Sequence, residues 1–139
     1  MVDSQQNVKK DRPVYKNIGL AQLIKYRLPW AGKVSILHRI SGAALFLMLP
    51  FLLYLLDQSL ASEVSYQKFQ AITGHFLVKI ICLGLIWCFL HHFCAGIRYL
   101  LLDLEIGVEK VDANRSAIFV FFLGLALTAV VGLKLFGLY

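Results

Sequence analysis

Three long apolar segments constrain the fold of this chain more than any other feature of its sequence. They cover about residues 34–56, 76–102 and 116–133. No Asp, Glu, Lys or Arg occurs between Ile40 and Leu56, and none occurs between Ile80 and Ile97. A transmembrane helix needs roughly 20 such residues. The segments therefore predict an all-α membrane protein with three transmembrane helices.

The composition excludes the main alternatives. Hydrophobic residues make up 59% of the 139 residues and charged residues 16%, whereas soluble domains average about 45–50% and about 25%. A soluble domain of this length exposes too much of its surface to water to bury such an excess of hydrophobic residues. Disordered chains are also excluded, because they are far more polar. The runs also lack the polar alternation of membrane β-strands. The net charge of +6 is concentrated at one end beside membrane-like sequence, so we expect no nucleic-acid partner.

The chain divides into a basic arm at residues 1–33 and a membrane-anchor domain at residues 34–139. A secretory signal would place its apolar segment earlier and end it at small residues, so we expect the first span to be retained. Leu20, Leu23 and Ile24 would share one face of a short interfacial helix that stops at Pro29. An irregular arm is the alternative interpretation.

The distribution of Lys and Arg predicts the orientation in the membrane. One side has Lys9, Lys10, Arg12, Lys16, Lys25, Arg27, Lys33, Arg39, Arg98, Lys110 and Arg115, and the other has Lys68, Lys79 and Lys134. Basic residues accumulate on the cytoplasmic side of membrane proteins. Eleven against three therefore predicts an N-terminus inside and a C-terminus outside, with residues 57–75 as an outer loop.

Polar residues gather at the start of the first span. Ser35, His38, Arg39 and Gly42 are spaced i, i+3, i+4 and i+7, which places them on one helix face. The alternative is that Arg39 only extends to the lipid headgroups. A hydroxyl, an imidazole and a permanent cation on one stripe instead favour a binding site.

The second span carries His91 and His92. His92 precedes Arg98 by six residues, which is roughly 9 Å along a helix. Small residues lie on its face, namely Cys88, Ala95 and Gly96. They would leave space for a flat macrocycle, although a hydrogen bond between helices is the simpler explanation of a membrane histidine. His91 points about 100° away and stays open as an alternative ligand.

The expected topology brings these groups into one leaflet, because the first span begins on the side where the second ends. The shared basic pocket would contain Ser35, His38, Arg39, His92 and Arg98. Cations and an imidazole suit haem, whose propionates are anionic. They also suit a quinone, whose carbonyls need hydrogen-bond donors.

The motifs resemble those of the succinate dehydrogenase cytochrome b subunit, the larger membrane anchor of complex II. They are Arg-Pro at 12–13, Ser-Ile-Leu-His-Arg-Ile-Ser-Gly at 35–42, His-Phe-Cys-Ala-Gly-Ile-Arg at 92–98, and Asp103. The likeness extends over nearly the whole chain. Two positions depart from the family pattern. Tyr99 stands where the family often has His, and Leu102 stands where it often has Met or an aromatic residue.

The resemblance implies specific roles for the polar residues. His92 would be an axial ligand of the iron of haem b, which is shared with a second membrane-anchor subunit. Ser35 and Arg39 would bind ubiquinone, and His38 and Arg39 would lie near the haem propionates. Electrons would pass from an iron–sulfur subunit to ubiquinone, in respiration and the tricarboxylic acid cycle. Succinate oxidation itself would occur on a flavoprotein subunit.

The resemblance also implies a multi-subunit helical bundle in a bacterial inner membrane, in preference to the mitochondrial inner membrane. Two alternatives remain: the anchor of a fumarate reductase, and a haem-free anchor that only docks soluble subunits. A small transporter is disfavoured because the first and third spans have no charged residue or helix break near the midplane.

Overall fold

The computed structural model describes residues 19, 22 and 25–138, and this part of the chain is helical without any β-strand. Its helices are α2 (Trp30–Ala61), α3 (Glu63–Thr73), α4 (Phe76–Asp103) and α5 (Lys110–Leu135). The interfacial helix predicted for Leu20, Leu23 and Ile24 lies outside the described residues.

Three of these helices, α2, α4 and α5, are long and apolar enough to cross a membrane. The prediction of an all-α fold with three such helices is therefore confirmed. Large apolar side chains along them are exposed, among them Phe46 and Phe119. Such surfaces fit lipid or a protein partner better than water.

Backbone hydrogen bonds explain where two of the long helices end. At the end of α4, Glu105 has a φ of 61°, and the amides of Glu105 and Ile106 donate to the carbonyls of Leu102 and Leu101. At the end of α5, Gly137 takes the same left-handed conformation with a φ of 72°. This is the Schellman arrangement, which satisfies the last carbonyls of a helix. At the end of α4 this arrangement begins the short connection to α5, and the two helices run antiparallel.

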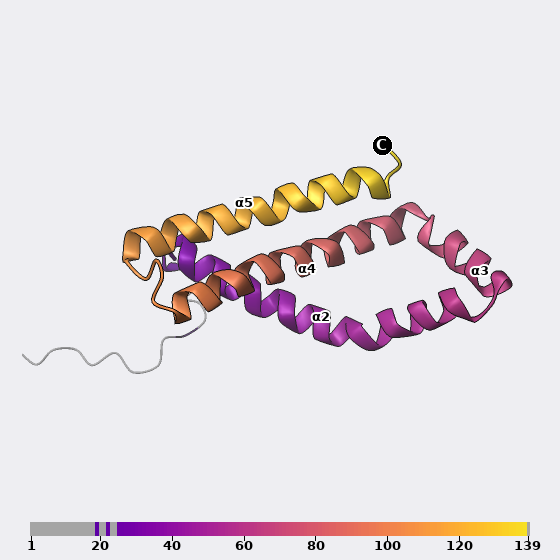
Figure 1. The fold of residues 1–139 in the computed structure, drawn as a ribbon, viewed down its shortest axis with the longest axis horizontal. Coiled ribbons are helices and arrows are strands. Elements are labelled where there is room, and N and C mark those ends of the chain that lie inside the picture. Colours follow the sequence, from indigo (N-terminus) through magenta and orange to yellow (C-terminus); the bar gives the residue numbers. More distant parts are fainter. Residues whose placement is uncertain (1–18, 20–21, 23–24, 139) are drawn as a thin grey trace, which may run out of the picture.

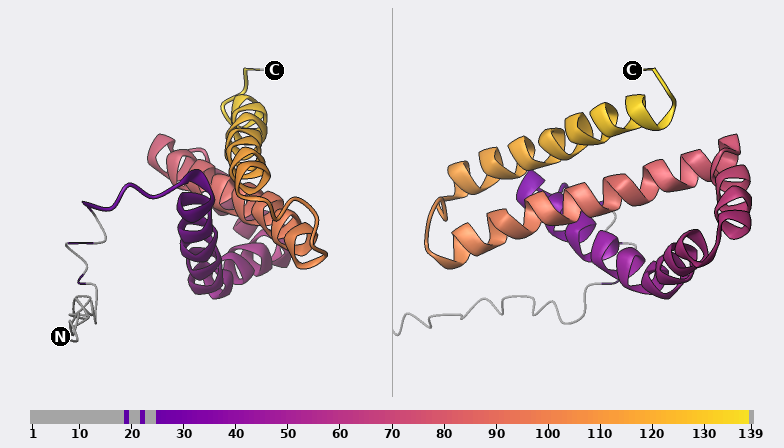
Figure 2. Two further views of the ribbon diagram at one scale, coloured as in Figure 1. Left: turned by 90° about the vertical axis from the view of Figure 1, so that its left-hand side faces the viewer. Right: turned by 45° about the vertical axis from the view of Figure 1, so that its right-hand side comes forward.

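The long helix α4 packs against both α2 and α5, and it lies between them in Figure 1. The start of α2, the end of α4 and the start of α5 meet at one end of the molecule, as Figure 2 also shows. There the amide of Ala31 donates to Asn114 Oδ1 at 3.2 Å. Val34, Ala95 and Ala117 are fully buried at this end, so the core holds together the end that carries the polar residues.

Toward the other end, α2 and α4 separate, and α3 connects them (Figure 1). Pro50 lies inside α2, which changes direction along its length in the same view. A proline removes one backbone hydrogen bond and bends a helix. The divergence leaves a cavity of about 560 Å³ between α2 and α4, with Leu45, Leu85 and Phe89 among its lining residues.

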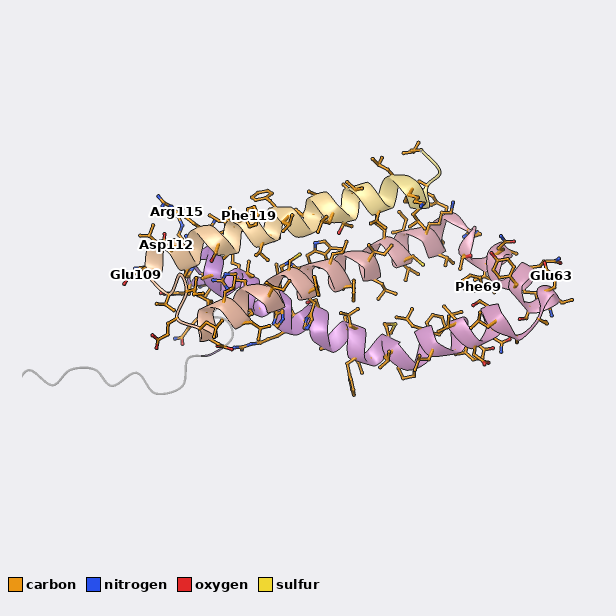
Figure 3. All side chains as sticks on the ribbon, viewed as in Figure 1. Glu63, Phe69, Glu109, Asp112, Arg115 and Phe119 are labelled. Carbon is orange, nitrogen blue, oxygen red and sulfur yellow. The ribbon has the colours of Figure 1, made fainter. Side chains whose placement is uncertain are left out.

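The connection expected at residues 57–75 is largely helical, because α2 continues to Ala61 and α3 follows it. Ser62 caps this helix by accepting a hydrogen bond from the amide of Ser65 at 3.1 Å, and Glu63 lies in its first turn. An acidic residue there interacts favourably with the helix dipole. Figure 3 shows Glu63 and Phe69 on this short helix, far from the polar end of the molecule.

Candidate functional site

Two histidines from different helices meet in the polar half of the α2–α4 interface. The imidazole rings of His38 and His92 stack with centroids 4.1 Å apart and planes inclined by 10°. Each ring lies near a glycine of the other helix. A Cβ built on Gly42 would lie 2.7 Å from His92 Cε1, and one built on Gly96 would lie 3.7 Å from His38 Nε2. The absence of side chains at these two glycines lets the rings approach.

The hydrogen bonds of His92 define which ring nitrogen is free. Its Nδ1 lies 3.0 Å from the carbonyl oxygen of His38 and 3.3 Å from Ser41 Oγ. Ser41 Oγ itself donates to the His38 carbonyl at 2.9 Å. Because a carbonyl can only accept, we assign the ring proton to Nδ1, which leaves a lone pair on Nε2. Histidines that bind metals are held in this way by a carbonyl behind the ring.

The neighbouring His91 faces α5 instead of α2. It is fully buried, stacks on Trp87 at 5.3 Å and touches the edge of Phe121 of α5 at 6.4 Å. A Cβ on Gly124 of α5 would lie only 3.4 Å from His91 Cα. Both ring nitrogens of His91 are enclosed, and neither has a hydrogen-bond partner among the described residues. This packing leaves no room for a macrocycle at His91.

The other two predicted residues, Ser35 and Arg39, lie nearer the start of α2. Ser35 is half-buried and Arg39 is exposed. Neither side chain has a hydrogen bond or ion pair to another residue in the described part of the chain. His38 Nε2 is also buried without such a partner. The Ser35 hydroxyl and the Arg39 guanidinium thus remain available at this end of α2, whereas His38 Nε2 is enclosed against Gly96 of α4.

Arg98 does not join this group, so the sequence interpretation of one pocket containing it was wrong. Its Nε donates to Ser116 Oγ at 2.9 Å and its Nη2 donates to the Ala113 carbonyl at 2.8 Å. Six residues along a helix correspond to a rotation of about 600°, so His92 facing α2 leaves Arg98 facing α5. This hydrogen bond between α4 and α5 was not predicted from the sequence.

Tyr99 links the two sides of α4, and sequence reasoning missed its contacts. Its ring lies 5.1 Å from the His38 ring and 5.3 Å from the Arg98 guanidinium carbon. Its hydroxyl is buried with no partner in the described part. The available signal was the position of Tyr99 itself, directly after Arg98 and seven residues, or two helical turns, after His92.

The donor set around His92 fits a porphyrin better than a metal held by protein ligands alone. The described residues contain no group of three or more His, Cys, Asp or Glu that could hold a metal ion. His92 supplies a single imidazole with a free Nε2, and the cavity lined by Leu45, Leu85 and Phe89 is apolar. Leu85 and Leu45 lie seven residues from His92 and His38, which is two turns deeper on the same faces. The cavity therefore begins deeper along these helices than the two imidazoles, and its apolar lining suits the apolar body of a macrocycle.

Comparison with known proteins shows the family to which the chain is related. Residues 9–131 match the family described as succinate dehydrogenase/fumarate reductase transmembrane subunit. The chain is 36% identical over 100 residues to the succinate dehydrogenase cytochrome b556 subunit of Coxiella burnetii, which covers 71% of this chain and 80% of that protein. It is 32% identical over 92 residues to the subunit of the same name from Paracoccus denitrificans, covering 66% and 71%. The subunit of Rickettsia felis is 27% identical over 114 residues, covering 82% and 85%.

Proposed function

Because the chain belongs to the succinate dehydrogenase/fumarate reductase transmembrane subunit family, we propose that it is the cytochrome b anchor subunit of a succinate:ubiquinone oxidoreductase. It passes electrons from an iron–sulfur subunit to ubiquinone and contributes part of the quinone-reduction site. The observation that supports this proposal best is the hydrogen bond of 3.0 Å between His92 Nδ1 and the His38 carbonyl, because it leaves Nε2 ready to bind iron.

In this proposal His92 would hold the iron of haem b from this chain, together with a histidine of a second anchor subunit. The haem supplies one-electron transfer. His38 covers one face of the His92 ring at 4.1 Å, so it excludes water from that face and holds the ring in place. The exposed Arg39 would provide a cation for the propionates, and His38 would lie near them. Reversal of the roles of His91 and His92 is disfavoured because His91 is enclosed by Trp87 and Phe121.

The proposed quinone site uses Ser35 and Arg39. Ser35 donates its hydroxyl to a quinone carbonyl, and Arg39 supplies fixed positive charge where negative charge develops during reduction. The half-buried position of Ser35 and the exposure of Arg39 are consistent with a site completed by other subunits. Two turns separate Gly42 from Ser35, so the quinone and haem sites are neighbours on α2.

We further propose that the polar end of the molecule faces the cytoplasm of a bacterium and that the helices cross its inner membrane. Residues 1–33 form the cytoplasmic arm, and residues 34–139 form the anchor domain. The iron–sulfur and flavoprotein subunits dock on the cytoplasmic side, and the second anchor subunit packs against the exposed apolar faces of the long helices. The excess of basic residues on that side supports this orientation.

The direction of the reaction distinguishes a succinate dehydrogenase from a fumarate reductase. The family includes fumarate reductase subunits, whereas the three relatives above are all named as succinate dehydrogenase subunits. Their names favour succinate oxidation for this chain.

An absorbance spectrum of the purified complex tests the proposal directly. We expect the difference between the dithionite-reduced and oxidised spectra to show the bands of a b-type haem. An assembled complex that oxidises succinate but lacks these bands would identify the chain as a haem-free anchor. Comparison of ubiquinone reduction by succinate with fumarate reduction by a quinol then distinguishes the two directions.

A further inference from the structure

Arg98 is a buried cation without a counter-ion in the described part of the chain. Its exposed fraction is 5%. Its hydrogen bonds reach a hydroxyl and a carbonyl of α5, at Ser116 Oγ and Ala113 O, and both are neutral groups. The ion pair found among the described residues instead joins Arg115 to Asp112 at 3.9 Å, on the exposed side of α5 (Figure 3).

An uncompensated charge in a dry environment acts over a longer distance than a surface charge. Hydrogen bonds to neutral oxygens stabilise the guanidinium, but they do not cancel its charge. Water and salt screen exposed charges strongly, and they screen buried charges much less. The field of Arg98 therefore extends through the helix bundle, whereas that of Arg115, whose side chain is 78% exposed, does not.

A series of ring contacts connects Arg98 with His92. The guanidinium carbon lies 5.3 Å from the Tyr99 ring, Tyr99 lies 5.1 Å from His38, and His38 stacks on His92. Along α4 the two residues are separated by roughly 9 Å. At this distance and an effective dielectric constant of about 20, one unit charge changes a one-electron equilibrium by on the order of tenfold.

We propose that Arg98 raises the reduction potential of the haem held at His92. This inference rests on the proposed function. When ferric haem takes up one electron, the charge of the iron falls by one unit, and a fixed cation nearby stabilises the product. Arg98 is thus a residue that adjusts the haem potential from the far side of α4, without contact with the haem ligand.

The test is a redox titration of the haem in the assembled, purified complex, followed by its absorbance. We expect Arg98→Gln to lower the midpoint potential, because glutamine keeps hydrogen-bonding capacity but has no charge. The expected change is on the order of tenfold in the reduction equilibrium, which is about 59 mV for a one-electron couple. Arg98→Lys keeps the charge and should stay near the wild-type potential. Arg115→Gln is the matched control and should not change it.

A second pair of variants tests the charge while Arg98 stays in place. Ser116→Asp puts a carboxylate at the position that now accepts from Arg98 Nε, so it should lower the potential in the same direction. Ser116→Asn is its neutral control and should leave the potential unchanged. This pair decides the question if Arg98→Gln complexes do not assemble.

The outcomes separate this inference from the proposed function. A wild-type complex without haem contradicts the proposed function itself. A haem whose potential is the same in wild-type, Arg98→Gln and Ser116→Asp complexes overturns the role of Arg98. An Arg98→Lys potential as low as that of Arg98→Gln, or a Ser116→Asn potential as low as that of Ser116→Asp, also overturns it, because the geometry and not the charge would then be responsible.

Discussion

The rings of His38 and His92 lie face to face with their centroids 4.1 Å apart, although 54 positions separate them in the chain. The same spacing recurs on both helices, since a glycine follows each histidine by four residues, at Gly42 and Gly96. Residues at i and i+4 share a helix face, so each helix presents one ring and one gap to the other. The contact thus holds the proposed haem ligand between its own helix and α2.

Gly42→Ala adds only one methyl group, but it should disturb the haem site strongly. The added Cβ would lie 2.7 Å from His92 Cε1, so the ring or the helix must move. We expect haem retention to fall by roughly tenfold, as for other changes behind a metal ligand, measured as haem per complex after purification. Gly84→Ala in α4 is the matched control, because a Cβ there meets nothing within 4 Å. Equal haem content in both variants would show that the close approach of Gly42 does not position His92.

His92→Ala should remove the low-spin haem spectrum, whereas His91→Ala should largely preserve it. The reason is that His92 has a free Nε2, while His91 is enclosed between α4 and α5. Loss of the His91 ring leaves a cavity beside Phe121, so this variant should be less stable to heat and still bind haem. Reduced-minus-oxidised spectra of the two complexes give the answer. A normal spectrum in His92→Ala with loss in His91→Ala would reverse the ligand assignment.

Substitutions of Ser35 and Arg39 should separate quinone chemistry from succinate chemistry. Ser35→Ala should lower ubiquinone reduction by about tenfold for the loss of one hydrogen bond, and Arg39→Leu by roughly a hundredfold. Arg39→Lys should restore part of the activity, because an ammonium keeps the charge but not the planar fork.

The control for these variants is succinate oxidation with an artificial acceptor that takes electrons before the quinone. This activity should persist, because succinate oxidation takes place on another subunit in the proposed function. Normal ubiquinone reduction in Ser35→Ala and Arg39→Leu would rule out the quinone assignment. Joint loss of both activities would mean that the residues are needed for assembly.

Reporter fusions should establish the orientation in the membrane. An enzyme that is active only outside the cytoplasm should be active when fused after Tyr139 and inactive when inserted within residues 104–109. The physical reason is the excess of Lys and Arg on the side of the arm and of the second loop. The opposite pattern would place His92 in the outer leaflet and exclude electron delivery from cytoplasmic subunits.

The three membrane helices could be predicted because their signal is local. A run of apolar residues between Ile40 and Leu56 must be helical in lipid, where every backbone polar group needs a partner within its own segment. The sequence signal for α3 was weaker. Its eleven residues, Glu63–Thr73, mix polar and apolar side chains, and the helix depends on the Ser62 cap and on its position between α2 and α4.

The chain's own residue order determined that Ser35, His38 and Arg39 share one end of a helix, and that His91 and His92 point in different directions. These are consequences of helical periodicity. The order did not determine which of the two histidines faces α2 and which faces α5, because that depends on how α4 is rotated about its own axis between them. Tertiary packing decided it. The close approaches at Gly42 and Gly124 turn His92 toward α2 and His91 toward α5, and the same rotation turns Arg98 to Ser116, away from the pocket.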